Sequence, residues 1–248
     1  MAMNRSIEGL TSLGHHDLAQ RQADLQAEFQ RREPSMKDIP LTGRLSGLQT
    51  ARSEVALPPL SPETQRLIEH MRSDGYAVYD TAGKTPGSLR SEGMRYWYLN
   101  PALENVSAAP ALLAFNYKPS EFFLRGSKGL PHESQIGELL PDEAERVEKA
   151  YPSSGLIVRE AKLPEWSELA LRHFKETGGT GGRGVRIFGR DYDDPYTWTD
   201  TYENDEQGAH RAVFGSWDEA HGAVAHLWKP DNVSTRLRLA PVVEISRK

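Results

Sequence analysis

The strongest constraint on the fold is the separation of helix-like and strand-like segments along the chain. Roughly the last forty of the 248 residues contain three short stretches typical of strands: Ala212–Phe214, Ala223–Trp228, and Thr235–Ile245 with an interruption at Pro241. Helix-like patterns occur mainly earlier, and the short connections between the C-terminal stretches favour antiparallel pairing. We therefore expect an α+β fold, with helices mainly in the first two thirds packed on a mixed, mostly antiparallel sheet completed by C-terminal strands.

Helix-start signals at Ser61 mark the beginning of the main domain. Ser61 suits an N-cap, Pro62 the first helical position, and Glu63 the positive end of the helix dipole. Apolar residues then recur at helical spacing until Gly75, which ends the pattern. We expect a single α+β domain from residue 61 to residue 248.

Residues 1–60 differ from the rest of the chain. Helix formers from His15 to Arg32 carry only a narrow apolar stripe, and a connector rich in Pro and Gly follows. We expect an N-terminal arm that is partly helical, with disorder as the open alternative. An arm of this kind needs a surface to dock on, either the main domain or a second copy of the chain in a homodimer.

Composition narrows the functional classes. The chain contains no Cys, which excludes disulfides and thiolate chemistry and is compatible with a reducing cytosol. The net charge of -5 disfavours nucleic acid as a partner, and no apolar run approaches membrane length. We expect a soluble, cytoplasmic protein with no membrane association, and we predict no cofactor.

A second helix-like stretch begins at Pro164 and ends at a glycine-rich loop. The loop contains G-x-G-x-x-G from Gly179 to Gly184, followed by the strand-like Val185–Phe188. In dinucleotide-binding folds this run follows a strand and opens a helix, whereas here it closes a helix. A connector is therefore the favoured interpretation. The nearby arginines leave a modest anion-binding site open: Arg183, Arg186 and Arg190.

Other motif fragments are incomplete. Gly83-Lys84-Thr85 resembles the end of a phosphate-binding loop, but Val78 stands where that loop requires its first glycine. His132-Glu133 resembles the start of a zinc-protease helix, but Ile136 replaces the second histidine. We predict no metal site.

The most distinctive segment is acidic and aromatic. From residue 191 to residue 207 there is no Lys or Arg, while seven Asp or Glu residues alternate with Tyr and Trp. The alternation in Tyr196–Tyr202 fits a strand with its aromatic residues on one face and three threonines on the other. The aromatic residues either pack in a core or form a recognition face for a cation, a sugar or a protein. The predicted ligand-binding residues are Tyr196, Trp198, Asp200, Tyr202 and Glu203.

Two functional hypotheses follow. The first is a soluble intracellular binding or interaction protein that uses residues 191–207 for a cationic, sugar-like or protein ligand. The alternative is a small metal-independent hydrolase or transferase that uses His221 with Glu219 or Asp218, beside the arginine-bearing glycine loop. A cleft that contains His221 and the loop arginines would favour the enzyme, and an exposed acidic face would favour binding.

Overall fold

The computed structural model describes residues 59–178, 184–189, 192, 195–205, 208–218 and 222–247, without the side chains of residues 204, 205 and 218. The arm predicted for residues 1–60 lies almost wholly outside this range. The arm, its helix and the proposed domain boundary therefore stay predictions.

The described residues form two sheets. The first has the order β1-β3-β9-β4, with antiparallel pairing throughout; its strands are β1 (Tyr76–Thr81), β3 (Ala111–Asn116), β4 (Ile157–Glu160) and β9 (Pro241–Glu244). The second has the order β2-β7-β6-β5-β8; its strands are β2 (Tyr96–Leu99), β5 (Tyr196–Asp205), β6 (Gly208–Asp218), β7 (Gly222–Trp228) and β8 (Leu237–Arg238). Its three central strands are antiparallel to one another. Of the outer strands, β2 pairs in parallel with β7, and β8 pairs in parallel with β5. The predicted α+β class is confirmed, with two sheets in place of one.

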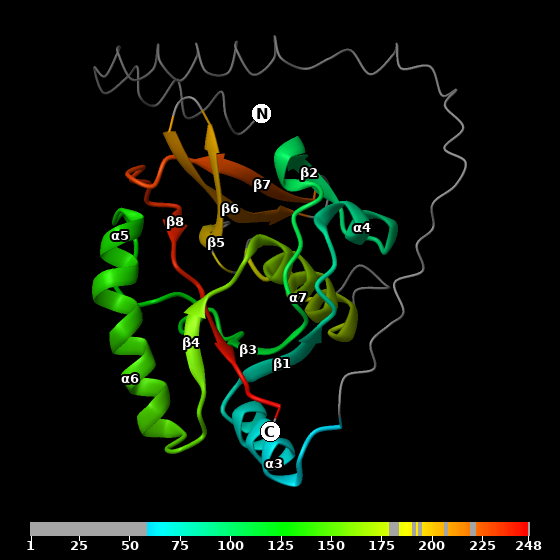
Figure 1. Ribbon diagram of the computed structural model, residues 1–248, viewed down its shortest axis with the longest axis vertical. Helices are drawn as coiled ribbons and strands as arrows, with labels where there is room; N and C mark the ends of the chain where they lie inside the picture. Colours follow the sequence, from blue (N-terminus) through cyan, green and yellow to red (C-terminus); the bar gives the residue numbers. More distant parts are fainter. Residues whose placement is uncertain are drawn as a thin grey trace. The chain divides into compact units, whose positions relative to one another are not determined.

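The helices come before most of the second sheet in the chain. They are α3 (Pro62–Ser73), α4 (Pro86–Ser91), the 3-10 turn η1 (Pro101–Leu103), α5 (His132–Ser134), the π-helical turn η2 (Gln135–Leu139), α6 (Leu140–Ala150) and α7 (Leu163–Glu176). Figure 1 shows α7 between the two sheets, where it contacts β1, β5 and β6. This position explains why α7 is buried along most of its length.

The two faces of the first sheet contribute to two different apolar clusters. Val78 and Leu112 face α3 and α6, while Tyr79 and Leu113 face the cluster that contains α7. Because side chains alternate across a strand, one sheet supplies both clusters. The helix-start signals are confirmed at α3, where the Ser61 hydroxyl accepts a hydrogen bond from the Thr64 amide at 3.1 Å.

The predicted strand at Val185–Phe188 is wrong. Val185 and Arg186 have no regular structure and Ile187 and Phe188 form a turn, in which Phe188 adopts a φ of +66°, a value uncommon outside glycine. The turn inserts the fully buried Phe188 ring among the rings of Phe122, Trp166 and Phe214, with centroid distances of 4.9, 5.1 and 5.4 Å. Ile187 and Phe188 are therefore buried in the core without strand pairing, whereas Val185 is exposed.

The loop that contains Gly83-Lys84-Thr85 lies beside a carboxylate of the protein, that of Glu168. The buried Glu168 carboxylate on α7 accepts hydrogen bonds from the Ala82 amide at 2.9 and 3.0 Å, and the Lys84 amide lies at 3.5 Å. Backbone amides that converge in this way bind anions. The loop thus binds a carboxylate of the protein itself, in agreement with the exclusion of a phosphate-binding loop from the sequence.

Candidate functional site

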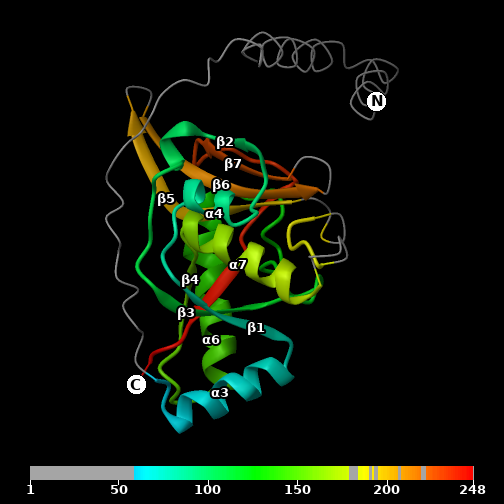
Figure 2. The same cartoon turned by 90° about the vertical axis from the view of Figure 1, so that its right-hand side faces the viewer.

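Tyr196–Asp205 of the acidic, aromatic segment forms β5, and at the outer end of the β5–β6 hairpin these two strands pair with no other described strand. β8 pairs with β5 only at Tyr196 and Thr197, and β7 pairs with β6 no further than Arg211. Beyond these points, residues 202–205 pair with residues 208–211. We call residues 202–205 and 208–210 the hairpin arm; Figure 2 shows this end of the hairpin extending past the rest of the sheet.

The predicted ligand-binding residues separate into a buried and an exposed group. The Trp198 side chain is fully buried in a cluster with Leu124, Val213, Leu237 and Leu239, and its ring lies edge-on to His132 at 5.3 Å between centroids. Tyr196 is half-buried, with its ring tilted against Trp228 at 5.5 Å. Both aromatic side chains therefore contribute to packing of the inner half of the hairpin.

The other three predicted residues lie at the surface. Asp200, Tyr202 and Glu203 are exposed, and Tyr202 has 65% of its area accessible. Between Trp198 and Tyr202 the register of β5 against β6 shifts, which marks an irregularity typical of a β-bulge. The bulge thus coincides with the change from buried to exposed residues.

The threonine face of β5 anchors the hairpin to the core. The Thr201 hydroxyl accepts a hydrogen bond from the Leu163 amide at the start of α7, at 2.9 Å. The Thr197 hydroxyl accepts one from the Ala240 amide at 2.9 Å, and the Thr199 hydroxyl donates to the Ala212 carbonyl at 2.9 Å. Buried backbone groups are satisfied in this way, so the inner half of β5 is held firmly in place.

A chain of charged groups connects the exposed surface to the interior. Arg211 Nη1 lies 3.6 Å from Asp200 Oδ1 and 3.4 Å from Glu160 Oε2, and Glu160 Oε1 lies 2.8 Å from His132 Nε2. Glu160 and His132 are both buried. Arg211 therefore balances part of the negative charge at Asp200, whereas no ion pair is found for Glu203 within the described residues.

The predicted anion-binding arginines are only partly described. The Arg186 guanidinium lies over the Phe174 ring, 4.6 Å from its centroid, which is a cation–π arrangement. Arg183 and Arg190 lie outside the described residues. The anion site therefore stays a prediction.

The catalytic hypothesis also falls largely outside the described residues. Glu219 and His221 are not described, and for Asp218 only the backbone is described, paired with Gly222 at the end of β6. The hypothesis stays untested. Among the described residues, no group of three His, Asp or Glu side chains could hold a metal ion.

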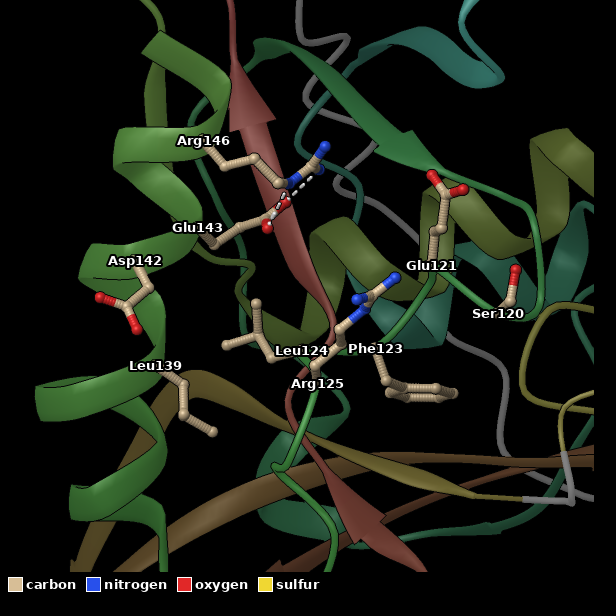
Figure 3. Close-up of a pocket in the computed structure, with 9 residues that line it drawn as sticks. All are labelled: Ser120, Glu121, Phe123, Leu124, Arg125, Leu139, Asp142, Glu143 and Arg146. Carbon is tan, nitrogen blue, oxygen red and sulfur yellow. Dashed lines mark hydrogen bonds and ion pairs between the residues drawn. The ribbon is translucent and has the colours of Figure 1, made fainter. Parts of the chain in front are cut away.

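A separate recess of about 430 Å³ lies between α6 and the loop that follows β3 (Figure 3). Arg146 donates two hydrogen bonds to the Glu143 carboxylate, at 2.7 and 2.8 Å, and one to the Tyr76 hydroxyl at 3.1 Å. Figure 3 shows the Arg125 guanidinium directed into the recess, where it makes no hydrogen bond or ion pair with another described residue. Among the described residues, the recess thus contains one arginine without an acidic partner, Arg125, and one that is paired with a carboxylate, Arg146.

Comparisons with known protein families, with curated proteins and with solved structures find no match to this chain. No helix in the described part of the chain is long and apolar enough to cross a membrane.

Sequence reasoning missed the recess of Figure 3. Its charged residues come from a loop and a helix that are separated in sequence: the loop supplies Glu121 and Arg125, and the helix supplies Asp142, Glu143 and Arg146. The helix is α6, which has acidic residues in its first turn. No local pattern, however, indicated which loop would face it.

Proposed function

We propose that this protein is a binding protein whose hairpin arm, with the adjoining Asp200, recognises a cationic segment of a protein partner. The observation that carries the proposal is the exposure of Tyr202 on an arm that is paired only with itself. Two-stranded ribbons are marginally stable alone, so a projecting ribbon with an exposed aromatic ring suggests an interaction role.

The chemistry of the surface favours a basic partner. Tyr202 offers an aromatic face, Asp200 and Glu203 offer exposed carboxylates, and both kinds of group attract cations. Tyrosine is also among the residues that contribute most to protein interfaces, whereas peripheral charges act mainly on the association rate and its salt dependence.

The outer part of the β5 edge supports recognition of an extended segment. Opposite β6, the Asp200 amide donates to the Ala161 carbonyl at 2.9 Å, and beyond it no described strand pairs with residues 202–205 on that side. Such an edge can accept an added strand through main-chain hydrogen bonds, with side chains on alternate positions for specificity. We therefore favour an extended, lysine-rich segment over a sugar.

The test uses a fluorescein-labelled peptide with alternating Lys and Thr, followed by anisotropy at low and high salt. We expect Tyr202→Ala to weaken binding by about tenfold or more, as for an interface hot spot. Glu203→Gln should weaken binding at low salt, with a smaller effect at high salt. Trp97→Ala is the matched control, because Trp97 is also strongly exposed, at 58%, but lies on β2.

The proposal would be overturned if the peptide bound Tyr202→Ala as tightly as the unchanged protein, or if a Glu/Thr peptide bound equally well. Binding of a neutral oligosaccharide in competition with the peptide would reassign the surface to sugars.

The proposal includes a cytoplasmic setting, with which the cysteine-free, acidic composition is compatible. A homodimer through the N-terminal arm is part of the same proposal, and light scattering of the full chain tests it.

A further inference from the structure

The recess of Figure 3 contains two opposite charges that do not neutralise each other. The loop between β3 and α5 contributes Glu121 and Arg125, and Figure 3 shows their side chains extending from the loop in the same direction. Both residues are exposed, and neither forms an ion pair with another described residue. Each charge therefore borders the recess without a counter-charge from the described part of the chain.

The backbone that carries these two charges is fixed to the core. Between them, Phe123 and Leu124 are buried, and the Leu124 amide donates a hydrogen bond to the Leu239 carbonyl at 2.9 Å. The Asn116 side chain orients Glu121, because Asn116 Nδ2 donates to Glu121 Oε2 at 2.7 Å. An amide donor leaves the negative charge of a carboxylate in place, and Glu121 Oε1 accepts no hydrogen bond from another described residue. The loop thus presents both charges from a fixed base.

The wall that α6 contributes is electrically balanced for the most part. Arg146 donates to both oxygens of Glu143, whose side chain is only 18% exposed. Because these two groups already satisfy each other, they compete weakly for a charged ligand. With Asp142, the lining carries three carboxylates and two guanidinium groups, an excess of one negative charge. This balance disfavours a multiply charged anion such as phosphate.

Apolar side chains complete the lining of the recess. Phe123 and Leu124 lie in the loop, with 8% and 7% of their areas exposed, and the half-buried Leu139 lies at the end of η2. The volume of about 430 Å³ falls within the range of small-molecule sites, about 300 to 1,000 Å³. Such sites combine apolar surface with a few polar groups that fix the orientation of the ligand.

We propose that this recess binds a free amino acid with an apolar side chain. The Arg125 guanidinium donates paired hydrogen bonds to the carboxylate of the ligand, and the ammonium group of the ligand donates to Glu121 Oε1. The apolar side chain of the ligand lies against Leu124 and Leu139, where it removes apolar surface from water. A molecule with only one of the two charges leaves the opposite charge of the recess unpaired, which lowers its affinity.

The two charged groups can adapt to the spacing of the charges on the ligand. Glu121 and Arg125 are exposed, so their side chains can change rotamer while the buried residues between them hold the backbone. The recess uses no residue of the hairpin arm, so this inference stands or falls independently of the proposed function.

The test is nuclear magnetic resonance of the full chain with ¹³C-labelled leucine methyl groups, titrated with unlabelled L-leucine. We expect the methyl resonances of Leu124 and Leu139 to shift in a saturable way, and those of Leu89, on α4 and outside the recess, to stay unchanged. Two analogues each keep one charge: 3-methylbutan-1-amine lacks the carboxylate, and 4-methylpentanoate lacks the amine. Each should bind at least about tenfold more weakly than leucine.

Two variants identify which side chain binds which end of the ligand. Arg125→Gln should weaken leucine binding by about tenfold or more and give leucine and 3-methylbutan-1-amine similar affinities. Glu121→Gln should make leucine bind no better than 4-methylpentanoate. Arg66→Gln and Glu69→Gln, the same changes at exposed positions of α3, are the matched controls and should leave binding unchanged.

The proposal is wrong if leucine causes no saturable shift in the folded protein, or if either analogue binds as tightly as leucine. Tighter binding of inorganic phosphate than of leucine would assign the recess to anions instead. Arg125 and Glu121 are exposed, so both variants should stay folded, and their amide spectra verify this directly. If Glu121→Gln failed to fold, Arg125→Gln and the two analogues would still decide the question.

Discussion

Trp198 and Tyr202 lie four residues apart on one strand and have opposite environments. Trp198 is fully buried and Tyr202 is largely exposed. The alternation of aromatic residues could predict that the two side chains share a face of the strand. It could not predict that the neighbouring strands end between the positions of Trp198 and Tyr202, so that only the hairpin continues. The boundary between packing and surface depends on where β7 and β8 end, which is a property of the whole sheet.

We expect Trp198→Ala to lower the free energy of unfolding by about 3 to 5 kcal/mol, because it empties a large buried site. Tyr202→Ala should change this free energy by less than about 0.5 kcal/mol. Urea unfolding of both variants, followed by circular dichroism, makes the comparison. A small effect of Trp198→Ala would contradict the burial of its ring.

His173 should make stability dependent on pH. Its folded pKa of about 4 lies below the ordinary value of 6.5, so the unfolded chain binds more protons between these values. The free energy of unfolding should be highest above pH 6.5 and fall as the pH is lowered toward 4, by about 2 to 3 kcal/mol at about pH 4.5.

His173→Phe isolates this contribution, because every other titrating group is retained. Urea unfolding at several pH values should show a shallower loss of stability with acid in the variant than in the unchanged protein. Parallel curves for the two proteins would mean that His173 is protonated as readily in the folded state as in the unfolded state.

At the scale of elements, α7 is fixed between the sheets by buried polar groups as well as by apolar packing. Glu168 binds the Ala82 amide, and Arg172 lies 3.0 Å from the same carboxylate. The Thr201 hydroxyl accepts from the Leu163 amide at the other end of the helix. These contacts determine the position of the helix along its axis relative to both sheets.

We expect Glu168→Ala to destabilise the protein by about 3 kcal/mol, because it leaves a buried amide without an acceptor and an arginine without its carboxylate. Glu69→Ala, on the exposed face of α3, is the control and should change stability by less than about 0.5 kcal/mol. Chemical denaturation of the two variants measures the difference. Equal effects would show that the contacts of Glu168 add little to folding.

Local signals in the sequence predicted individual elements well. The N-cap at Ser61, the helix that begins at Pro62 and the C-terminal strands all follow from short-range patterns. The sequence could not predict the parallel edge strands or the pairing of Tyr79 with His173, which are 94 residues apart. Neither residue carries a local signal for the other, because their contact depends on the docking of α7 against β1.

On the scale of the whole molecule, residues from Leu60 onward supply three apolar clusters to the described part of the chain. We predict that these clusters suffice for folding. We expect limited proteolysis to cut between Pro34 and Pro59, and a chain that lacks residues 1–58 to keep its circular dichroism and a cooperative thermal transition. Loss of that transition on truncation would show that the arm belongs to the core.

The C-terminal strand β9 lies in the interior of the first sheet, between β3 and β4. During synthesis β9 emerges after the other strands of this sheet, so these strands at first have no neighbour that joins β3 to β4. Both strands then present open edges, which are prone to pair with other chains. Synthesis must therefore pass β9 before the first sheet can close, and a nascent chain stalled before Pro241 should bind chaperones that a chain with an emerged β9 no longer binds.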